Sequence, residues 1–303
     1  MRALDYLFAG RPLLHLPVWS IYLVSLHYHF ELAHSSFGWG NLIIMILLSM
    51  AAAGAYFVNQ IYDEQSDALN DKLGFLQRGL VSRTGLWIGF IACSLISLVG
   101  AGLISLQMLV VFAQLVALGF IYSAPPFRLK DRPVWGLLAN AYGFGWLIVL
   151  TVVPDFGMHN LGLIGWDNPF YFMAAVGSIY VLTTIPDMAG DRLTGKQTIA
   201  VIWGVRSSLL LALMLDIAAT YIAWRSSYGW LFYLAAIAAF AMLPNVLVPH
   251  DRSILLAAKL PILLLTLLAG YFFPVYLVFI VALIFVTRIY YSKRFQIIYP
   301  RLA

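Results

Sequence analysis

Acidic side chains are rare in this chain, and nearly half of them fall in two short segments. Only 13 of the 303 residues are Asp or Glu, and four of these lie within residues 59–71. In this first segment Asn59, Asp63 and Asp67 follow one another at intervals of four residues. On a helix that spacing places all three side chains along one face.

The second segment, Asp187-Met-Ala-Gly-Asp191, repeats the same interval. Mg²⁺ takes oxygen ligands, usually one or two carboxylates together with water and substrate phosphates. Two carboxylate pairs facing each other could therefore hold Mg²⁺ ions that bridge a diphosphate, which the acidic groups alone would repel. We accordingly expect the metal-binding and catalytic residues to be Asn59, Asp63, Asp67, Asp187 and Asp191.

Basic residues near these segments suit an anionic phosphate ligand. Arg binds phosphate oxygens in a bidentate manner, and Lys acts as a point charge. The same charges could equally set the membrane topology of the chain, so the sequence leaves both roles open. The candidates are Lys72, Arg78, Arg128, Lys130, Arg192 and Lys196.

A third motif, Tyr122-Ser-Ala-Pro-Pro-Phe-Arg128-Leu-Lys130, lies between the two acidic segments. The two adjacent prolines must end the preceding helix and hold an extended turn. Such a turn would fix the directions of the Tyr122 hydroxyl and of the basic side chains. Asn140 follows shortly afterwards as a candidate for orienting the acceptor, although a hydrogen bond between buried helices explains it better.

The overall composition is typical of a membrane protein. Hydrophobic residues make up 62% of the chain and charged residues only 10%, whereas soluble domains contain about 25% charged residues. The net charge of +5 is explained by basic cytoplasmic loops, so no nucleic-acid partner is expected. With Cys93 as its single cysteine, the chain can form neither an internal disulfide nor a cysteine-rich metal site.

Apolar stretches recur along the whole chain, and a spanning helix needs roughly 20 such residues. The pattern gives ten candidate membrane helices, of which the last two are the least clearly separated. The candidates are residues 13–33, 40–61, 86–105, 107–123, 134–153, 169–186, 207–224, 228–248, 253–271 and 274–291.

The distribution of basic residues predicts the orientation. If the N-terminus is cytoplasmic, only Arg225 of the 18 basic residues falls on the outer side, as the positive-inside rule requires. Both termini and the motif loops are then cytoplasmic. The first residues do not have the pattern of a cleavable signal or transit peptide, and we expect a prokaryotic plasma membrane.

Taken together, the three motifs resemble those of the UbiA superfamily of intramembrane prenyltransferases. Their order and their positions, on the second expected helix, after the fourth and on the sixth, are similar to the family pattern. The resemblance covers most of the chain up to about residue 210. One departure concerns Lys72 to Gly79, where many members have an Arg-Pro-rich segment. The acceptor subfamily is therefore not assigned.

The resemblance implies an all-helical bundle, usually of nine helices, around a central cavity closed by a cytoplasmic cap. Apolar stretches that recur from one end of the chain to the other indicate one membrane domain over residues 1–303. It also implies that the five oxygen-bearing residues of the two acidic motifs bind metal or metal-bound water. Tyr122, Arg128 and Lys130 would then contact the diphosphate.

The function implied is Mg²⁺-dependent transfer of a prenyl group from an isoprenyl diphosphate to a hydrophobic acceptor, with an aromatic quinone precursor as the first expectation. Membrane lipid would surround the protein. A terpene cyclase of the same superfamily remains an alternative. A cation-coupled transporter is another, although its acids should lie at broken helices near mid-membrane rather than at helix ends.

Overall fold

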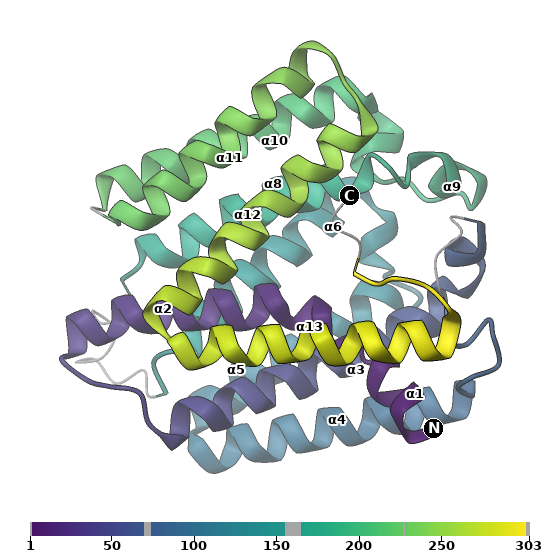
Figure 1. Ribbon diagram of the computed structural model, residues 1–303, viewed down its shortest axis with the longest axis horizontal. Coiled ribbons are helices and arrows are strands. Elements are labelled where there is room, and N and C mark those ends of the chain that lie inside the picture. Colours follow the sequence, from purple (N-terminus) through teal and green to yellow (C-terminus); the bar gives the residue numbers. More distant parts are fainter. Residues whose placement is uncertain (1, 70–73, 155–164, 227, 301–303) are drawn as a thin grey trace.

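The computed structural model describes residues 2–69, 74–154, 165–226 and 228–300. All regular elements assigned within these ranges are helices, so the all-α class expected from the sequence is confirmed. Figure 1 shows a bundle of long helices, with short helices at one end.

The described part of the chain forms a series of helices. In chain order they are α1 (Arg2–Ala9), η1 (Pro12–His15), α2 (Leu16–Ala33), α3 (Trp39–Leu69), α4 (Arg83–Ile104), α5 (Leu106–Ser123), η2 (Leu129–Asp131), α6 (Pro133–Asn140), η3 (Ala141–Leu147), α7 (Ile148–Leu150), α8 (Asp167–Thr184), α9 (Met188–Leu193), α10 (Ile199–Arg225), α11 (Gly229–Leu247), α12 (Asp251–Phe272) and α13 (Pro274–Phe295).

Nine helical segments in the described ranges are long and apolar enough to cross a bilayer. They are Ala3–Ala33, Trp39–Gln65, Pro133–Leu150 and the helices α4, α5, α10, α11, α12 and α13. Helix α8 is not among them, because it opens with Asp167, Asn168 and Pro169. It packs against α10, η3 and α12, so protein rather than lipid surrounds much of it. The ten stretches expected from the sequence correspond to these nine segments and α8.

Serine side chains begin two of the spanning helices. The Ser82 hydroxyl accepts a hydrogen bond from the Gly85 amide at 3.0 Å at the start of α4. The Ser105 hydroxyl does the same for the Met108 amide at 3.0 Å at the start of α5. Such caps satisfy amide groups that have no partner inside the helix, and Ser105 alone separates α4 from α5.

The stretch expected as one helix over residues 134–153 is divided. It consists of α6, the π-helical turn η3 and the short α7, and π-turns of this kind often occur at functional sites. At Gly145 in η3, a Cβ atom would lie 2.4 Å from the Met173 amide nitrogen. The absence of a side chain therefore allows η3 to pack closely against the backbone of α8.

Helix α10 is interrupted near its start. Gly204 has φ 79° and ψ 168°, a backbone conformation that residues with a Cβ rarely adopt. The helix therefore consists of a short segment ahead of Gly204 and a longer spanning segment after it. The sequence predicted only the later part, from residue 207.

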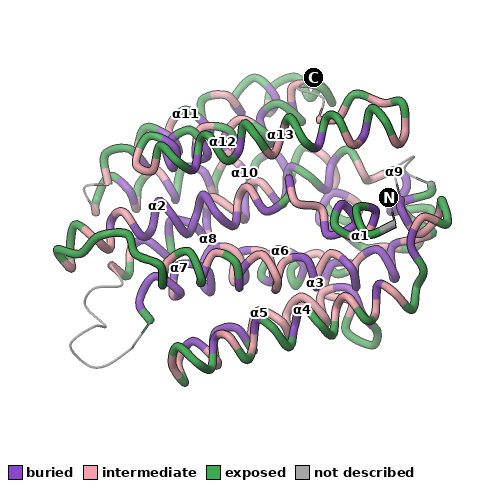
Figure 2. Tube along the Cα trace, turned by 60° about the horizontal axis from the view of Figure 1, so that its bottom comes forward, coloured by how far each residue is buried: buried purple, intermediate pink, exposed green. Residues whose placement is uncertain are grey.

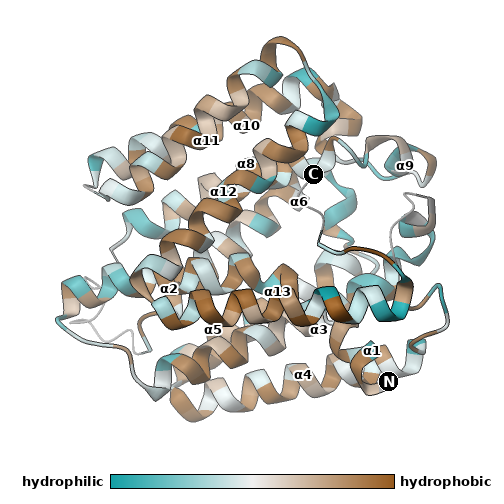
Figure 3. Ribbon diagram, in the orientation of Figure 1, coloured by the Kyte–Doolittle hydropathy of each residue, from teal (hydrophilic) through white to brown (hydrophobic). Residues whose placement is uncertain are grey.

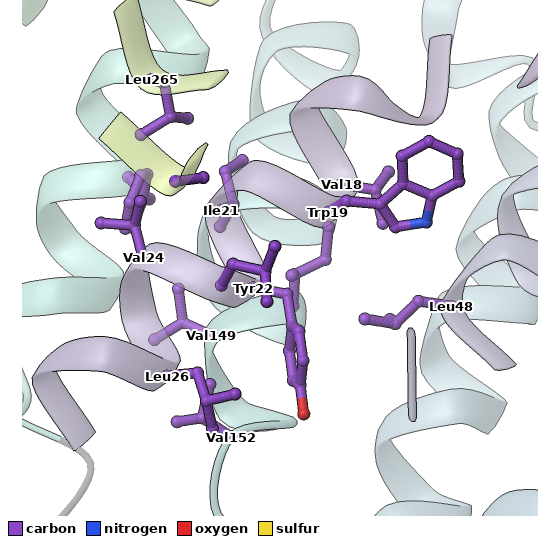
Figure 4. Packing of buried hydrophobic residues seen from close by; sticks show 14 of the residues in the cluster. Val18, Trp19, Ile21, Tyr22, Val24, Leu26, Leu48, Val149, Val152 and Leu265 are labelled. Carbon is purple, nitrogen blue, oxygen red and sulfur yellow. The ribbon is translucent and has the colours of Figure 1, made fainter. Parts of the chain in front are cut away.

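Helix α2 lies in the main hydrophobic core. Figure 2 shows much of this helix as buried, and Tyr22 and Leu26 have no exposed surface. Around them pack Leu48 from α3, Val149 from α7 and Leu265 from α12, as Figure 4 shows. This core brings α2 together with α3, α7 and α12.

The outer surface of the bundle is apolar. Figure 3 shows mostly hydrophobic residues along α4, α5, α12 and α13, and Leu103, Phe240 and Val275 are strongly exposed. A soluble protein rarely exposes such extensive apolar surface, whereas lipid accommodates it. The chain is therefore a multi-pass integral membrane protein.

Candidate active site

The first acidic motif lies on the last turns of α3. Asp63 and Asp67 are 6% and 7% exposed, although they are among the most polar groups of the chain. The Asn59 amide donates hydrogen bonds to Asp63 Oδ2 at 2.7 Å and to Ser123 Oγ at 3.2 Å. Because Ser123 ends α5, Asn59 links the motif to a neighbouring helix.

The turn after α5 brings Lys130 to the first motif. Its Nζ atom lies 2.7 Å from Asp63 Oδ1, and its side chain is 7% exposed. Burial lowers the pKa of the Lys130 ammonium below its ordinary value, although the negative charge of Asp63 opposes this effect. A positive charge is therefore held at a buried position against the carboxylate of Asp63.

In the same turn, Arg128 is directed differently from Lys130. The Arg128 backbone has φ 42°, and its Nε atom forms an ion pair with Asp131 Oδ2 at 2.6 Å. The backbone carbonyl of Asp131 accepts a hydrogen bond from the Gln197 amide at 3.0 Å. This contact fixes the turn to the segment that follows α9.

Lys196 joins the two acidic motifs. Its Nζ atom lies 3.3 Å from Asp63 Oδ1 and 3.6 Å from Asp191 Oδ1, and Asp191 is buried on α9. Burial disfavours the charged form of Lys196, but the nearby Asp63 and Asp191 outweigh it and raise its pKa above the ordinary value. The Thr198 hydroxyl lies 3.4 Å from Asp191 Oδ2 and donates to it.

The other residues expected at this site have different surroundings. Asp187 is half-buried at the N-terminal end of α9, and Arg192 is exposed on that helix. Arg78 is also exposed, and its guanidinium lies 5.3 Å from the centre of the Phe295 ring. This contact places Arg78 against the end of α13. Lys72 lies outside the described residues.

Tyr122 and Asn140 contact each other. The Asn140 amide donates to the Tyr122 hydroxyl at 3.1 Å and to the Gly136 carbonyl at 2.9 Å. A Cβ atom at Gly136 would lie 2.1 Å from the Tyr180 hydroxyl, so this glycine leaves space for a second tyrosine. The hydrogen bond between helices that the sequence left open for Asn140 is present.

Arg11 is a site residue that the sequence did not identify. Its Nη2 atom lies 3.5 Å from Asp67 Oδ2, and its guanidinium lies 6.0 Å from the centre of the Tyr56 ring. From the sequence, Arg11 was interpreted only as a charge that sets membrane topology. Its position directly before Pro12, just ahead of the apolar stretch expected over residues 13–33, was the available signal.

A polar pocket of about 260 Å³ lies beside these groups. Glu64 contributes to its wall and forms an ion pair with Arg83 at 2.8 Å. Lys196, which contacts both acidic motifs, also lines this pocket. Its lining residues are Ile61, Tyr62, Glu64, Gln65, Arg83, Arg128, Thr194 and Lys196.

The donor groups of this site fit Mg²⁺. Within the described residues no three Asp, Glu, His or Cys side chains form a ready-made metal cluster, and Lys130 and Lys196 contact Asp63 instead. Mg²⁺ nevertheless needs few protein ligands, because water and substrate phosphates complete its octahedron. The hard oxygen atoms of Asn59, Asp63 and Asp191 are of the kind that this ion prefers.

Comparison with known proteins relates this geometry to a family. The model of the UbiA prenyltransferase family matches residues 18–250, which is well over half of the chain. A UbiA homologue from Archaeoglobus fulgidus, solved bound to GPP and Mg²⁺, superposes with a TM-score of 0.67 at 18% identity. This likeness covers 88% of the present chain and 98% of that structure.

Two curated relatives differ in the acceptors that their names imply. The probable homogentisate phytyltransferase 2 of Oryza sativa subsp. japonica is 31% identical, over 66% of this chain and 51% of its own length. The digeranylgeranylglyceryl phosphate synthase of Thermococcus gammatolerans is 27% identical, over 73% and 75% respectively. The chain spans about half the length of the first curated relatives that it matches. From the family match and the shared fold, the chain belongs to the UbiA prenyltransferase family.

Proposed function

We propose that this protein transfers a prenyl group from an isoprenyl diphosphate to a lipophilic acceptor within the membrane, with Mg²⁺ as cofactor. The observation that carries the proposal is the junction of Asp63, Lys130, Lys196 and Asp191. It combines carboxylates that suit a metal with ammonium groups that suit a diphosphate. Both kinds of group are needed to stabilise a diphosphate as it leaves.

In this proposal the protein assists the breaking of the allylic C–O bond. Lys130 and Lys196 are held in low-exposure positions, where a positive charge stabilises the developing negative charge more strongly than in water. Bound Mg²⁺ supplies further neutralisation of the phosphate oxygens. Asp63, Asp67, Asp187 and Asp191, with Asn59, are the proposed metal-binding residues, and Tyr122 and Arg128 are proposed to contact the diphosphate.

The prenyl carbon then forms a bond with a nucleophilic carbon or oxygen of the acceptor, and the acceptor loses a proton. A central cavity poor in water would protect the electron-deficient prenyl group from hydrolysis. Tyr56 lies one turn before Asn59 on α3, and its aromatic face could stabilise a positive charge. We propose an aromatic acceptor first, because several of the matched relatives are named for aromatic substrates.

We further propose that the helix ends carrying the two acidic motifs lie on the cytoplasmic side, as do both termini. We also propose that residues 1–303 form one domain. The placement of 17 of the 18 basic residues on one side supports this orientation, and helices α1 and α9 lie toward the same end of the bundle (Figure 1). We propose a prokaryotic plasma membrane as the location; relatives from archaea support it, whereas the chloroplastic relatives from plants do not.

The proposal is tested by measuring diphosphate release from geranylgeranyl or farnesyl diphosphate. Purified protein in lipid nanodiscs would be given Mg²⁺ and a membrane lipid extract as a source of acceptor. We expect release that stops with EDTA and falls at least about a hundredfold in Asp187→Ala, because a proposed metal ligand is lost.

Glu31→Gln is the matched control, since this exposed carboxylate pairs with His27 on α2. It should retain wild-type activity. If the wild type neither releases diphosphate nor shows Mg²⁺-dependent binding of a prenyl diphosphate, the enzyme proposal is wrong and vesicle transport assays become the appropriate test. Release with a cyclised hydrocarbon as the product would instead identify a terpene cyclase.

A further inference from the structure

The first and last helices of the described chain are joined by a buried charged contact. Asp5 on α1 has no exposed surface. Its carboxylate accepts hydrogen bonds from Arg294 Nε at 3.1 Å and Nη2 at 3.0 Å, and from the Tyr290 hydroxyl at 2.6 Å. Two parallel bonds from one guanidinium give both strength and a defined orientation. These three residues are called the terminal clasp below.

Further contacts fix α1 around this clasp. The Phe8 ring stacks on Tyr290 with centroids 3.8 Å apart and an interplanar angle of 9°. The Tyr6 hydroxyl accepts a hydrogen bond from the Ser82 amide at 3.1 Å, at the cap of α4. Helix α1 is therefore attached to α13 and α4 at once, and its position along the bundle is well determined.

The same short segment leads directly into the active site. The Ala9 carbonyl, at the end of α1, accepts a hydrogen bond from the Gln60 side chain at 2.5 Å. Two residues later, the Arg11 guanidinium lies 3.5 Å from Asp67 Oδ2. Because Gln60 and Asp67 flank Asp63 on α3, the placement of α1 determines how Arg11 meets the first acidic motif.

We propose that Asp5, Tyr290 and Arg294 are positioning residues of the prenyl-transfer site, because the clasp they form holds Arg11 against Asp67. This inference rests on the proposed function. A partner that hydrogen-bonds a metal-binding carboxylate fixes its orientation and increases the metal affinity of the site. The clasp contributes such an orientation through Arg11, although none of its own residues lies in the first or second acidic motif.

The family match does not include this arrangement. It covers residues 18–250, whereas Asp5 and Arg11 precede that range and Tyr290 and Arg294 follow it. A contact that only stabilised the two ends of the chain would change folding stability alone. The experiment must therefore separate an effect on substrate affinity through Arg11 from a general loss of folding stability.

Four single variants, Asp5→Asn, Arg294→Gln, Tyr290→Phe and Arg11→Met, would be compared in nanodiscs. We expect the KM for geranylgeranyl diphosphate to rise about tenfold in Asp5→Asn, Arg294→Gln and Arg11→Met, the size of effect typical of a lost partner of a metal ligand. In each, kcat should change much less than KM. Tyr290→Phe removes one hydrogen bond and should give a smaller rise. Arg288→Gln, an exposed arginine on the same helix, is the matched control and should be unchanged.

The decisive measurement is a double-mutant cycle, which detects whether two residues act through each other. Asp5→Asn should have little further effect on KM when Arg11 is already Met. If its full effect persists in that background, the clasp does not act through Arg11 and the inference is wrong. The inference is equally wrong if the clasp variants lower the Tm without changing KM.

A variant in which the charges of Asp5 and Arg294 are exchanged controls for loss of folding. The double variant Asp5→Arg/Arg294→Asp restores opposite charges and should recover part of the lost affinity. If Asp5→Asn does not fold, the rise in KM for geranylgeranyl diphosphate can still be measured in Tyr290→Phe. A wild-type protein without Mg²⁺-dependent turnover or prenyl diphosphate binding would overturn the proposed function and this inference with it, whereas an active wild type with unaffected clasp variants would overturn the inference alone.

Discussion

Asp63→Asn is expected to reduce Mg²⁺-dependent diphosphate release by about a thousandfold, the loss typical of removing a key electrostatic group from an active site. The Asp63 carboxylate contacts both Lys130 and Lys196, and it is a proposed ligand of Mg²⁺. Asparagine preserves the shape but removes the charge. The measurement is the rate of diphosphate release at saturating prenyl diphosphate, together with the Tm.

The same substitution should also destabilise the protein. Lys130 would be left buried without its carboxylate, and breaking a buried ion pair by removing one partner costs about 3–5 kcal/mol. Asp251→Asn on the exposed first turn of α12 makes the same chemical change and should leave the activity and the Tm unchanged. Wild-type activity in Asp63→Asn would contradict a role of this carboxylate in the reaction.

Lys130→Met is expected to raise the KM for prenyl diphosphate by about a hundredfold, as for loss of a desolvated charge that binds an anionic ligand. Methionine keeps most of the apolar stem but removes the ammonium group that lies 2.7 Å from Asp63 Oδ1. Asp63 retains Lys196 at 3.3 Å, so the loss of stability should be smaller than in Asp63→Asn. KM and Tm would be measured on the same preparations.

Lys293→Met, at an exposed position on α13, is the matched control for the loss of a lysine charge. The double variant Asp63→Asn/Lys130→Met adds a second comparison, because removing both members of a buried pair is often close to neutral for stability. It should therefore recover the Tm but not the activity. A lower Tm with an unchanged KM in Lys130→Met would show that Lys130 serves only as a counterion.

The long apolar stretches and the acidic motifs were readable from the sequence because both are local patterns. Runs of apolar residues identify membrane helices, and the four-residue spacing of Asn59, Asp63 and Asp67 places them on one helix face. The expected stretch at 86–105 therefore agrees closely with α4. Local patterns also identified Lys130 and Lys196 as candidates, although not their shared contact with Asp63.

The remaining features depend on contacts between distant parts of the chain. Arg11 and Asp67 are 56 residues apart, and no local pattern distinguishes a site arginine from one that sets topology. Helix α1 is only eight residues long, too short to give a hydropathy signal. The π-helical turn η3 was not foreseen either, since it depends on close packing of Gly145 against α8.

The break at Gly204 separates the tilt of the spanning part of α10 from the position of the short segment before it. A spanning helix tilts to match the thickness of the surrounding bilayer, and a continuous rigid helix would transmit that tilt to its cytoplasmic end. In α10 the non-helical backbone at Gly204, with φ 79°, interrupts this rigid connection. The short segment after Thr198, which donates to Asp191, is thereby uncoupled from the tilt of the span. We therefore expect the second acidic motif to keep its alignment with Asp63 in membranes of different thickness.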